Sequence, residues 1–111
     1  MSGTSCDGIA AAMVDIAARG GAEVLAYRTF PYPAATRAAL LDLCRVETAR
    51  VDDICYWNFA LGELLAAAVV RLARGAGVEL GTIDLIGSHG QTIHHLPRGA
   101  AGRARPRSSP A

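Results

Sequence analysis

The sequence predicts an α/β or α+β layer with one sheet, and three observations support this fold class. Two apolar runs lie on either side of a Gly-Gly turn signal near the N-terminus, which is typical of a β-hairpin. Two stretches with helical spacing of apolar residues follow, and a further short apolar run comes after them. The resulting order of strand, strand, helix, helix, strand places helices against one sheet.

The predicted hairpin comprises residues 9–16 and 23–30. Both runs are rich in apolar residues, and the Gly-Gly pair between them supplies the conformational freedom that a tight turn needs. Pro31 and Pro33 follow the second run. Because proline cannot donate a hydrogen bond to a neighbouring strand, we expect the second strand to end there.

Two helices are predicted next, over residues 34–44 and about 52–74. The most apolar part of the second, residues 59–73, carries Glu63 and Arg71 and is shorter than the ~20 apolar residues that span a bilayer. We therefore interpret it as a buried helix. Its predicted core face follows the i, i+3, i+4, i+7 spacing and consists of Ile54, Trp57, Leu61, Leu64, Leu65, Ala68 and Leu72.

The rest of the chain divides into a short strand and a low-complexity tail. Gly75 or Gly77 should end the second helix, and residues 82–86 should form the last strand. From Arg98 to Ala111 no apolar side chain is larger than Ala, so this segment cannot bury enough surface to offset its ordering entropy. We predict that residues 98–111 are disordered.

The net charge and the cysteines give no indication of several kinds of partner and site. The net charge of +1 gives no reason to expect nucleic acid or an anionic membrane as a partner. Cys6, Cys44 and Cys55 are odd in number and contain no CxxC pair, so neither a disulfide framework nor a zinc site is indicated. The cytoplasm is the expected location, and no secretory signal is expected.

The first candidate site is the glycine-rich stretch from Ser2 to Gly8, just before the first predicted strand. Glycines let the backbone approach a ligand closely, and hydroxyl and N–H groups can bind phosphate oxygens. Asp7 could hold a water bound to Mg²⁺, which needs only one or two carboxylates. The alternative is a tight turn capped by Asp7, and spacing alone favours it, because the stretch matches neither GxGxxG nor the P-loop pattern.

The second candidate site is the stretch from Gly87 to Thr92, after the last predicted strand. Ligands of open α/β sheets favour the crevice beyond strand ends, and side chains of the types found here could bind sugar hydroxyls. The alternative is a polar turn that satisfies its own backbone. The polar side chains concerned are those of Ser88, His89, Gln91 and Thr92.

The histidines do not indicate a metal site. His94 and His95 are adjacent and would point to opposite faces of a strand, and no Cys or carboxylate cluster completes a ligand shell with His89. A nucleophilic Ser88 is equally weak, because the G-x-S-x-G elbow is absent.

The two motifs together resemble one family. MSGTSCDGIAAAMVDI at residues 1–16 resembles the opening signature of the anhydro-N-acetylmuramic acid kinases, and LIGSHGQTIHHLP at residues 85–97 resembles their second signature. The stretch at residues 57–63 is similar to the family's intervening helix. The similarity covers residues 1–97, which we interpret as a partial N-terminal kinase domain.

The resemblance implies a fold and a reaction. The family is part of the superfamily of sugar kinases, heat-shock ATPases and actin, with a mixed sheet, helices and a cleft that closes on ATP. Its members open the 1,6-anhydro ring of anhydro-N-acetylmuramic acid with water and transfer the γ-phosphoryl group of ATP to O6, in cell-wall recycling. The implied cofactors are ATP and Mg²⁺. The implied partners are this amino sugar and ATP, with neither nucleic acid nor membrane, and a homodimer in the full-length enzyme.

The resemblance also implies site residues. The Mg²⁺ site would include Asp7, and the sugar would meet Ser88, His89, Gly90, Gln91 and Thr92. The phosphate loop would comprise Gly3, Thr4, Ser5, Cys6, Asp7, Gly8, Ile9 and Ala10.

Three departures from the family pattern affect what is expected of this chain. Met1 aligns with an internal methionine, so the first strand is missing, and Ala10 stands where the family usually has Asp. The family also continues where this chain changes to an Arg-rich tail, as a frameshift would produce. Because the family's catalytic aspartate would lie beyond residue 111, no catalytic residue is assigned, and we expect an inactive N-terminal fragment. The alternatives are a non-catalytic nucleotide- or sugar-binding module and a small structural domain.

Overall fold

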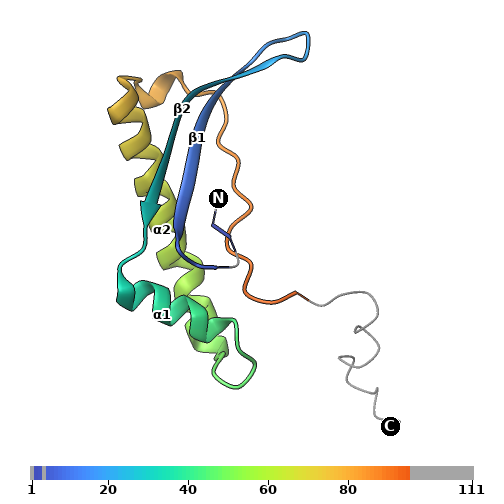
Figure 1. Cartoon of the computed structure of the whole chain (residues 1–111), viewed down its shortest axis with the longest axis vertical. Coiled ribbons are helices and arrows are strands. Elements are labelled where there is room, and N and C mark those ends of the chain that lie inside the picture. Colours follow the sequence, from blue (N-terminus) through green and yellow to red (C-terminus); the bar gives the residue numbers. More distant parts are fainter. Residues whose placement is uncertain (1, 4, 96–111) are drawn as a thin grey trace, which may run out of the picture.

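The computed structural model describes residues 2, 3 and 5–95 of the chain. A long β-hairpin lies along α2, α1 crosses near one end of that helix, and the segment after α2 returns along the hairpin towards the N-terminus (Figure 1). The elements are β1 (Gly8–Ile16), β2 (Ala22–Pro31), α1 (Ala34–Leu43), α2 (Val51–Ala76) and the 3-10 turn η1 (Leu80–Thr82).

The predicted hairpin is confirmed. β1 and β2 pair antiparallel from Gly8 opposite Pro31 to Ile16 opposite Ala22, with one irregularity after Met13. In the turn, Gly20 has a φ of 91°, a conformation that suits glycine, which has no Cβ. β2 ends at Pro31, as expected from its missing N–H group.

Both predicted helices are also confirmed, with small shifts of their ends. α2 ends at the second of the two proposed glycines: Gly77 has a φ of 70°, and its N–H donates to the carbonyl of Arg74 at 3.2 Å. The N–H of Val78 donates to the carbonyl of Ala73 at 2.9 Å, which completes a Schellman motif. Gly75 lies within the helix.

The core lies where the hairpin and α1 meet one face of α2. Leu40 of α1 is 1% exposed and is among the most completely buried side chains in the described part of the chain. Its neighbours in the core come from all four elements and from the loops beside them, and are Cys6, Ile9, Phe30, Tyr32, Leu43, Leu61, Ala68 and Leu72.

The interpretation of α2 as a buried helix is wrong for much of its surface. Leu61, Ala68 and Leu72 are buried as predicted, but Ile54 is exposed and Phe59 is 75% exposed. The helix carries apolar residues on several sides, whereas the hairpin and α1 cover one face. An amphipathic spacing therefore identified the packed face correctly and underestimated how much apolar surface stays uncovered.

Phe30 fixes the end of β2 against α2. Its ring is 7% exposed, and the guanidinium carbons of Arg28 and Arg71 lie 5.0 and 4.8 Å from the ring centroid. One arginine comes from the hairpin and the other from the helix, so two cations attach to the same aromatic ring.

The predicted strand at residues 82–86 does not form. Leu80–Thr82 is a 3-10 turn, residues 83–90 have no regular structure, and Leu85 is 86% exposed. A strand needs a hydrogen-bonded neighbour, and the bridge nearest to this segment is the isolated parallel pair of Ser2 and Gln91. The expected mixed sheet is accordingly a two-stranded antiparallel sheet in the described part of the chain.

Two further expectations concern the membrane and the tail. No helix within residues 2, 3 and 5–95 is long and apolar enough to cross a bilayer. The tail at residues 98–111, predicted to be disordered, lies outside the described residues.

Two glycine substitutions should have opposite effects on stability. A Cβ at Gly8 would lie 2.5 Å from the carbonyl oxygen of Phe30, so Gly8→Ala should destabilise the chain by about 1–3 kcal/mol through overpacking. At Gly62, inside α2, a Cβ would meet nothing within 4 Å, and Gly62→Ala should stabilise the chain by about 0.5–1 kcal/mol. Urea denaturation measures both, and a neutral Gly8→Ala would contradict the close approach of the two strands.

Candidate functional site

The glycine-rich stretch forms a turn that leads directly into β1. The Cys6 N–H donates to the carbonyl of Gly3 at 3.1 Å, and Cys6 adopts a φ of 53°, which is unusual for a residue with a Cβ. The Asp7 carbonyl accepts from the Tyr32 N–H at 2.9 Å, which prolongs the pairing of the hairpin. The loop is thus held by the same backbone framework as the sheet.

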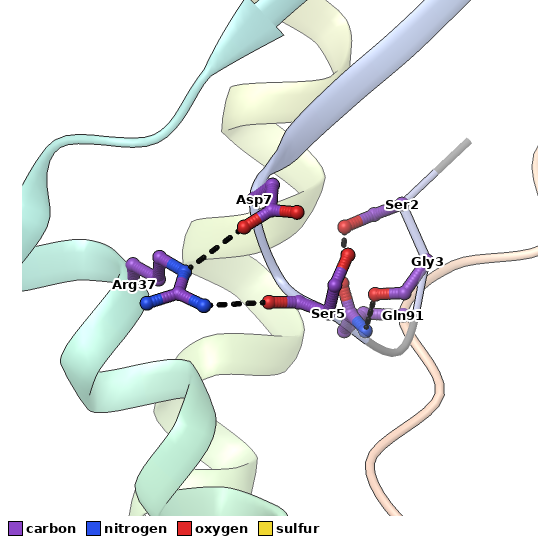
Figure 2. A network of polar contacts seen from close by, with 6 residues as sticks. All are labelled: Ser2, Gly3, Ser5, Asp7, Arg37 and Gln91. Atoms are coloured by element: carbon purple, nitrogen blue, oxygen red, sulfur yellow. Dashed lines mark hydrogen bonds and ion pairs between the residues drawn. The ribbon is translucent and has the colours of Figure 1, made fainter.

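An ion pair joins this loop to α1. Arg37 Nε donates to Asp7 Oδ1 at 3.2 Å, and Arg37 Nη2 donates to the Ser5 carbonyl at 3.4 Å (Figure 2). The Asp7 side chain is 73% exposed and that of Arg37 46%. A pair this exposed contributes less than about 1 kcal/mol to stability, so it orients the loop more than it stabilises the fold.

Gln91 brings the two predicted motifs together. Its Oε1 accepts a hydrogen bond from the Ser2 hydroxyl, and its Nε2 donates to the carbonyl of Gly3 at 2.8 Å (Figure 2). The same Nε2 also donates to the carbonyl of Thr92 at 2.9 Å. Ser2 and Gln91 also form the parallel bridge. Residues almost ninety positions apart therefore meet through one side-chain amide.

The Ser2 end of this contact is buried. Ser2 is 1% exposed, and its Oγ also accepts a hydrogen bond at 3.0 Å from the Tyr32 hydroxyl. Burial raises the pKa of Tyr32 above its ordinary value, and the hydrogen bond to Ser2 partly opposes that rise. Tyr32 therefore stays protonated and able to donate at neutral pH.

The polar side chains of the second motif other than Gln91 lie at the surface. Ser88, His89 and Thr92 are exposed, and the Ser88 Oγ accepts from the Gly90 N–H at 3.1 Å. Gly90 has a φ of 68°. The Ser88 contact is the kind expected of a turn that satisfies its own backbone, while the exposed side chains beside it remain accessible to a ligand.

Several predicted phosphate-loop residues are buried. Cys6 is 0% exposed and Ile9 5%, so their side chains belong to the core, and only their backbone could meet a phosphate. Ala10 and Gly8 are half-buried in β1. Gly3, Ser5 and Asp7 are exposed, and Thr4 lies outside the described residues. The accessible part of the predicted loop is therefore shorter than expected.

Burial also sets the chemistry of Cys6. It raises the pKa of the Cys6 thiol above the ordinary value of 9.0, and the neighbouring Cys44 thiol adds to the rise. As the pH increases, the Cys6 thiol of the unfolded chain would therefore ionise before that of the folded chain. The contribution of Cys6 to stability is therefore complete below about pH 9 and is lost as the pH rises further.

Two residues of the site were missed by sequence reasoning. Arg37 lies in the first turns of α1, and Tyr32 lies between two prolines after β2. Neither is close in sequence to the residues that it contacts, and no spacing pattern links them. The only signal in the sequence was charge: Arg37 is basic, and Asp7 in the loop before β1 is acidic.

An apolar cavity of about 310 Å³ adjoins the site and is lined in part by Gln91. Side chains of α1 and α2 form most of its wall, and Gly90, Gln91 and Ile93 close one side. Gln91 thus separates a polar surface from an apolar one. The helical residues that line the cavity are Leu40, Leu43, Ile54, Trp57, Asn58, Leu61, Gly62 and Leu65.

The exposed side chains of Asp7 and Arg37 are of the chemical types that bind a polyphosphate with Mg²⁺. Within the described residues no three His, Cys, Asp or Glu side chains gather as a metal-ligand cluster. Mg²⁺ retains several waters and is commonly bound through one carboxylate and the phosphates themselves, a role open to the exposed Asp7. The Arg37 guanidinium adds a positive charge at the same place.

Comparison with known proteins identifies the family. A family model described as "Anhydro-N-acetylmuramic acid kinase" matches residues 1–104. The chain belongs to this family. The match runs a little beyond residue 97, where the resemblance of the motifs ended.

Curated relatives agree with the family match. A protein named anhydro-N-acetylmuramic acid kinase from Caldanaerobacter subterraneus is 47% identical over 87% of this chain and 25% of its own length. Proteins of the same name from Salinibacter ruber and Bacillus cereus are 43% and 41% identical, over 90% and 88% of this chain and 26% of their own lengths. The chain therefore spans about a quarter of the length of these relatives.

Thiol labelling should separate the cysteines by burial. Cys55 is exposed on α2, whereas Cys6 is buried with a raised pKa, so iodoacetamide at pH 8 should modify Cys55 first and Cys6 last. Mass spectrometry of the digested chain measures the order. In 8 M urea the two should react at similar rates, and equal rates without urea would contradict the placement of Cys6 in the core.

Proposed function

We propose that residues 2–95 form one wall of the ligand site of an ATP-dependent anhydro-N-acetylmuramic acid kinase. The observation that carries this proposal is the direct contact of the two motifs through Gln91, because a phosphoryl transfer needs donor and acceptor side by side. The names of the curated relatives support this substrate. The proposed product is the sugar phosphorylated at O6, after water opens the anhydro ring.

In this proposal the accessible loop residues bind the phosphates of ATP. The backbone of Gly3 and the hydroxyl and backbone of Ser5 would donate to phosphate oxygens, and Arg37 would offset their charge. Asp7 would hold Mg²⁺ through a bound water. The metal, when bound, neutralises charge that develops on the transferring phosphoryl group.

The sugar would lie on the other side of Gln91. Ser88, His89 and Thr92 are exposed there and offer donors and acceptors of the kinds that sugar hydroxyls need. Gly90, between them, lets the backbone turn closely past a ligand. These residues would fix the orientation of the acceptor hydroxyl towards the phosphate loop.

The group that activates water is not assigned to any described residue. Asp15 lies seven residues along β1 from Gly8, or roughly 20 Å at the usual rise of a strand, which is too far for proton transfer at the loop. Asp84 follows η1, which comes after the end of α2 that lies beside Arg28 in the middle of β2 and away from the N-terminal loop (Figure 1). The proposal therefore places the catalytic base in another part of the kinase.

A non-catalytic nucleotide- or sugar-binding module is the second candidate. The open character of the site favours it, because Asp7 is 73% exposed and the polar groups gather on one surface. Such a surface can bind ligands weakly but does not exclude water, which phosphoryl transfer to a sugar requires. The two candidates differ in whether this segment supports turnover when the remaining parts of a kinase are supplied.

A chimera tests the proposed function. Residues 2–95 would replace the matching segment of the Caldanaerobacter relative, with which the chain shares 47% identity. We expect ATP-dependent phosphorylation of anhydro-N-acetylmuramic acid by the chimera and none by the 111-residue chain alone. Release of ADP and mass spectrometry of the sugar measure both. A folded chimera that binds both ligands without turnover would favour the binding module.

Asp7→Asn in the chimera tests the metal role. The substitution keeps the size and a hydrogen-bond acceptor for Arg37 but removes the charge that holds Mg²⁺. Both kcat and kcat/KM should fall together by about 10²-fold or more, because the lost interaction acts mainly in the transition state. The thermal midpoint should change little, because the ion pair is exposed. An unchanged kcat with a lowered thermal midpoint would show that Asp7 only caps the turn and does not hold Mg²⁺.

A further inference from the structure

We propose that Gln91 is a positioning residue that holds the phosphate loop in register with the sugar-binding turn, and does not itself contact the sugar. This inference rests on the proposed function and goes beyond it, because it assigns a coupling between the two ligand positions to one side chain. It also revises the expectation that Gln91 binds the substrate.

The first argument is the way in which the Gln91 amide is used. A glutamine side chain offers one oxygen acceptor and two N–H donors. The oxygen accepts from Ser2, and the nitrogen donates to the carbonyls of Gly3 and Thr92 at 2.8 and 2.9 Å. With both donors and the oxygen engaged by protein atoms, the side chain has little capacity left for a sugar hydroxyl.

The second argument is the direction in which these bonds run. Ser2 and Gly3 belong to the phosphate loop, whereas Thr92 belongs to the sugar turn. The amide group is planar and rigid, so a shift of one segment must move the amide or break a bond to the other. Gln91 is therefore a short mechanical link between the proposed phosphate and sugar positions.

The third argument is the buried continuation of the link. Tyr32 donates to Ser2 at 3.0 Å, and Ser2 in turn donates to Gln91, so three side chains form a chain of donors that begins directly after β2. Ser2 is 1% exposed, and hydrogen bonds shielded from water are costly to leave unmade. The link is thus anchored to the hairpin and resists displacement.

The Arg37 contact on the other side of the loop is of a different kind. It lies at the surface, with the Asp7 and Arg37 side chains 73% and 46% exposed, and water competes for both groups. Arg37 can therefore release the loop easily when a ligand binds, while the bond between Gln91 and the buried Ser2 persists. Binding of a nucleotide at the phosphate loop should therefore change the affinity of the turn for the sugar, and the reverse, through Gln91.

A double-mutant cycle on the 111-residue chain tests whether the link exists. Ser2→Ala, Gln91→Ala and the double variant are compared by urea denaturation. If the two side chains interact, the effect of the pair on the unfolding equilibrium constant should differ from the product of the single effects by about fivefold. Independent effects would overturn the proposed link. Ser88→Ala with Gln91→Ala serves as the control pair and should show independent effects, because the Ser88 hydroxyl bonds to Gly90.

A ligand-binding experiment on the chimera tests the positioning role. The dissociation constant of a non-hydrolysable ATP analogue with Mg²⁺ is measured with and without anhydro-N-acetylmuramic acid, for Gln91 and for the variants Gln91→Ala and Gln91→Glu. We expect the sugar to change the affinity for the nucleotide about fivefold or more, and both variants to reduce that factor to about one. The affinity for the sugar alone should stay within about threefold.

The outcomes separate this inference from the proposed function. A sugar affinity that falls tenfold or more in Gln91→Ala would show direct contact and overturn the inference. A coupling factor that both variants leave unchanged would also overturn it, and so would a chimera with Gln91 in which the sugar does not change the affinity for the nucleotide. A chimera that does not phosphorylate the sugar would count against the proposed function instead. The double-mutant cycle still decides whether the link exists, because it needs no ligand.

Discussion

The hydrogen bonds that run from Tyr32 through Ser2 to Gln91 determine how the two ends of the described chain are arranged. Without them the loop before β1 and the segment after α2 would be joined by the backbone bridge of Ser2 and Gln91, the exposed bond from Gln91 to Gly3 and scattered apolar contacts. Ser2 is small enough to be enclosed, and its hydroxyl can accept from one neighbour while donating to another. A polar chain of this kind, buried at Ser2, specifies one arrangement, because any slip leaves a donor or acceptor unpaired.

The rest of the structure provides a rigid support for this arrangement. The hairpin fixes where the loop begins, since Gly8 approaches the backbone of Phe30 too closely for any larger residue. Leu40 attaches α1 to the core, and α1 then presents Arg37 to the loop. The polar site is thus positioned by two elements whose own places are set by apolar packing and strand pairing.

Sequence reasoning was most successful where a local pattern decides the structure. The hairpin, both helices and the stop at Gly77 follow from turn residues, proline and helical spacing. The prediction of a strand at residues 82–86 was wrong, because apolar composition cannot show whether a neighbouring strand is available for pairing.

The site shows the same division between local and distant information. The two motifs were identified from their residues, but nothing in their spacing predicted that they lie in contact. The contacts of Arg37 and Tyr32 depend on tertiary distance, which a single sequence does not encode in any spacing. The positioning role proposed for Gln91 could not be predicted for the same reason: its type suits a sugar ligand, and only the structure shows that its amide hydrogen-bonds to protein atoms.

The ring of Phe30 between two arginines makes the molecule respond to ionic strength in an unexpected way. Arg28 and Arg71 lie within 5.0 and 4.8 Å of one centroid, so two like charges are held no more than about one Debye length apart at 0.1 M salt. Both are exposed, so added salt screens the repulsion between them. The same salt weakens the attraction of Asp7 for Arg37. A rise in salt therefore relieves a repulsion within the scaffold while it weakens an attraction that holds the loop.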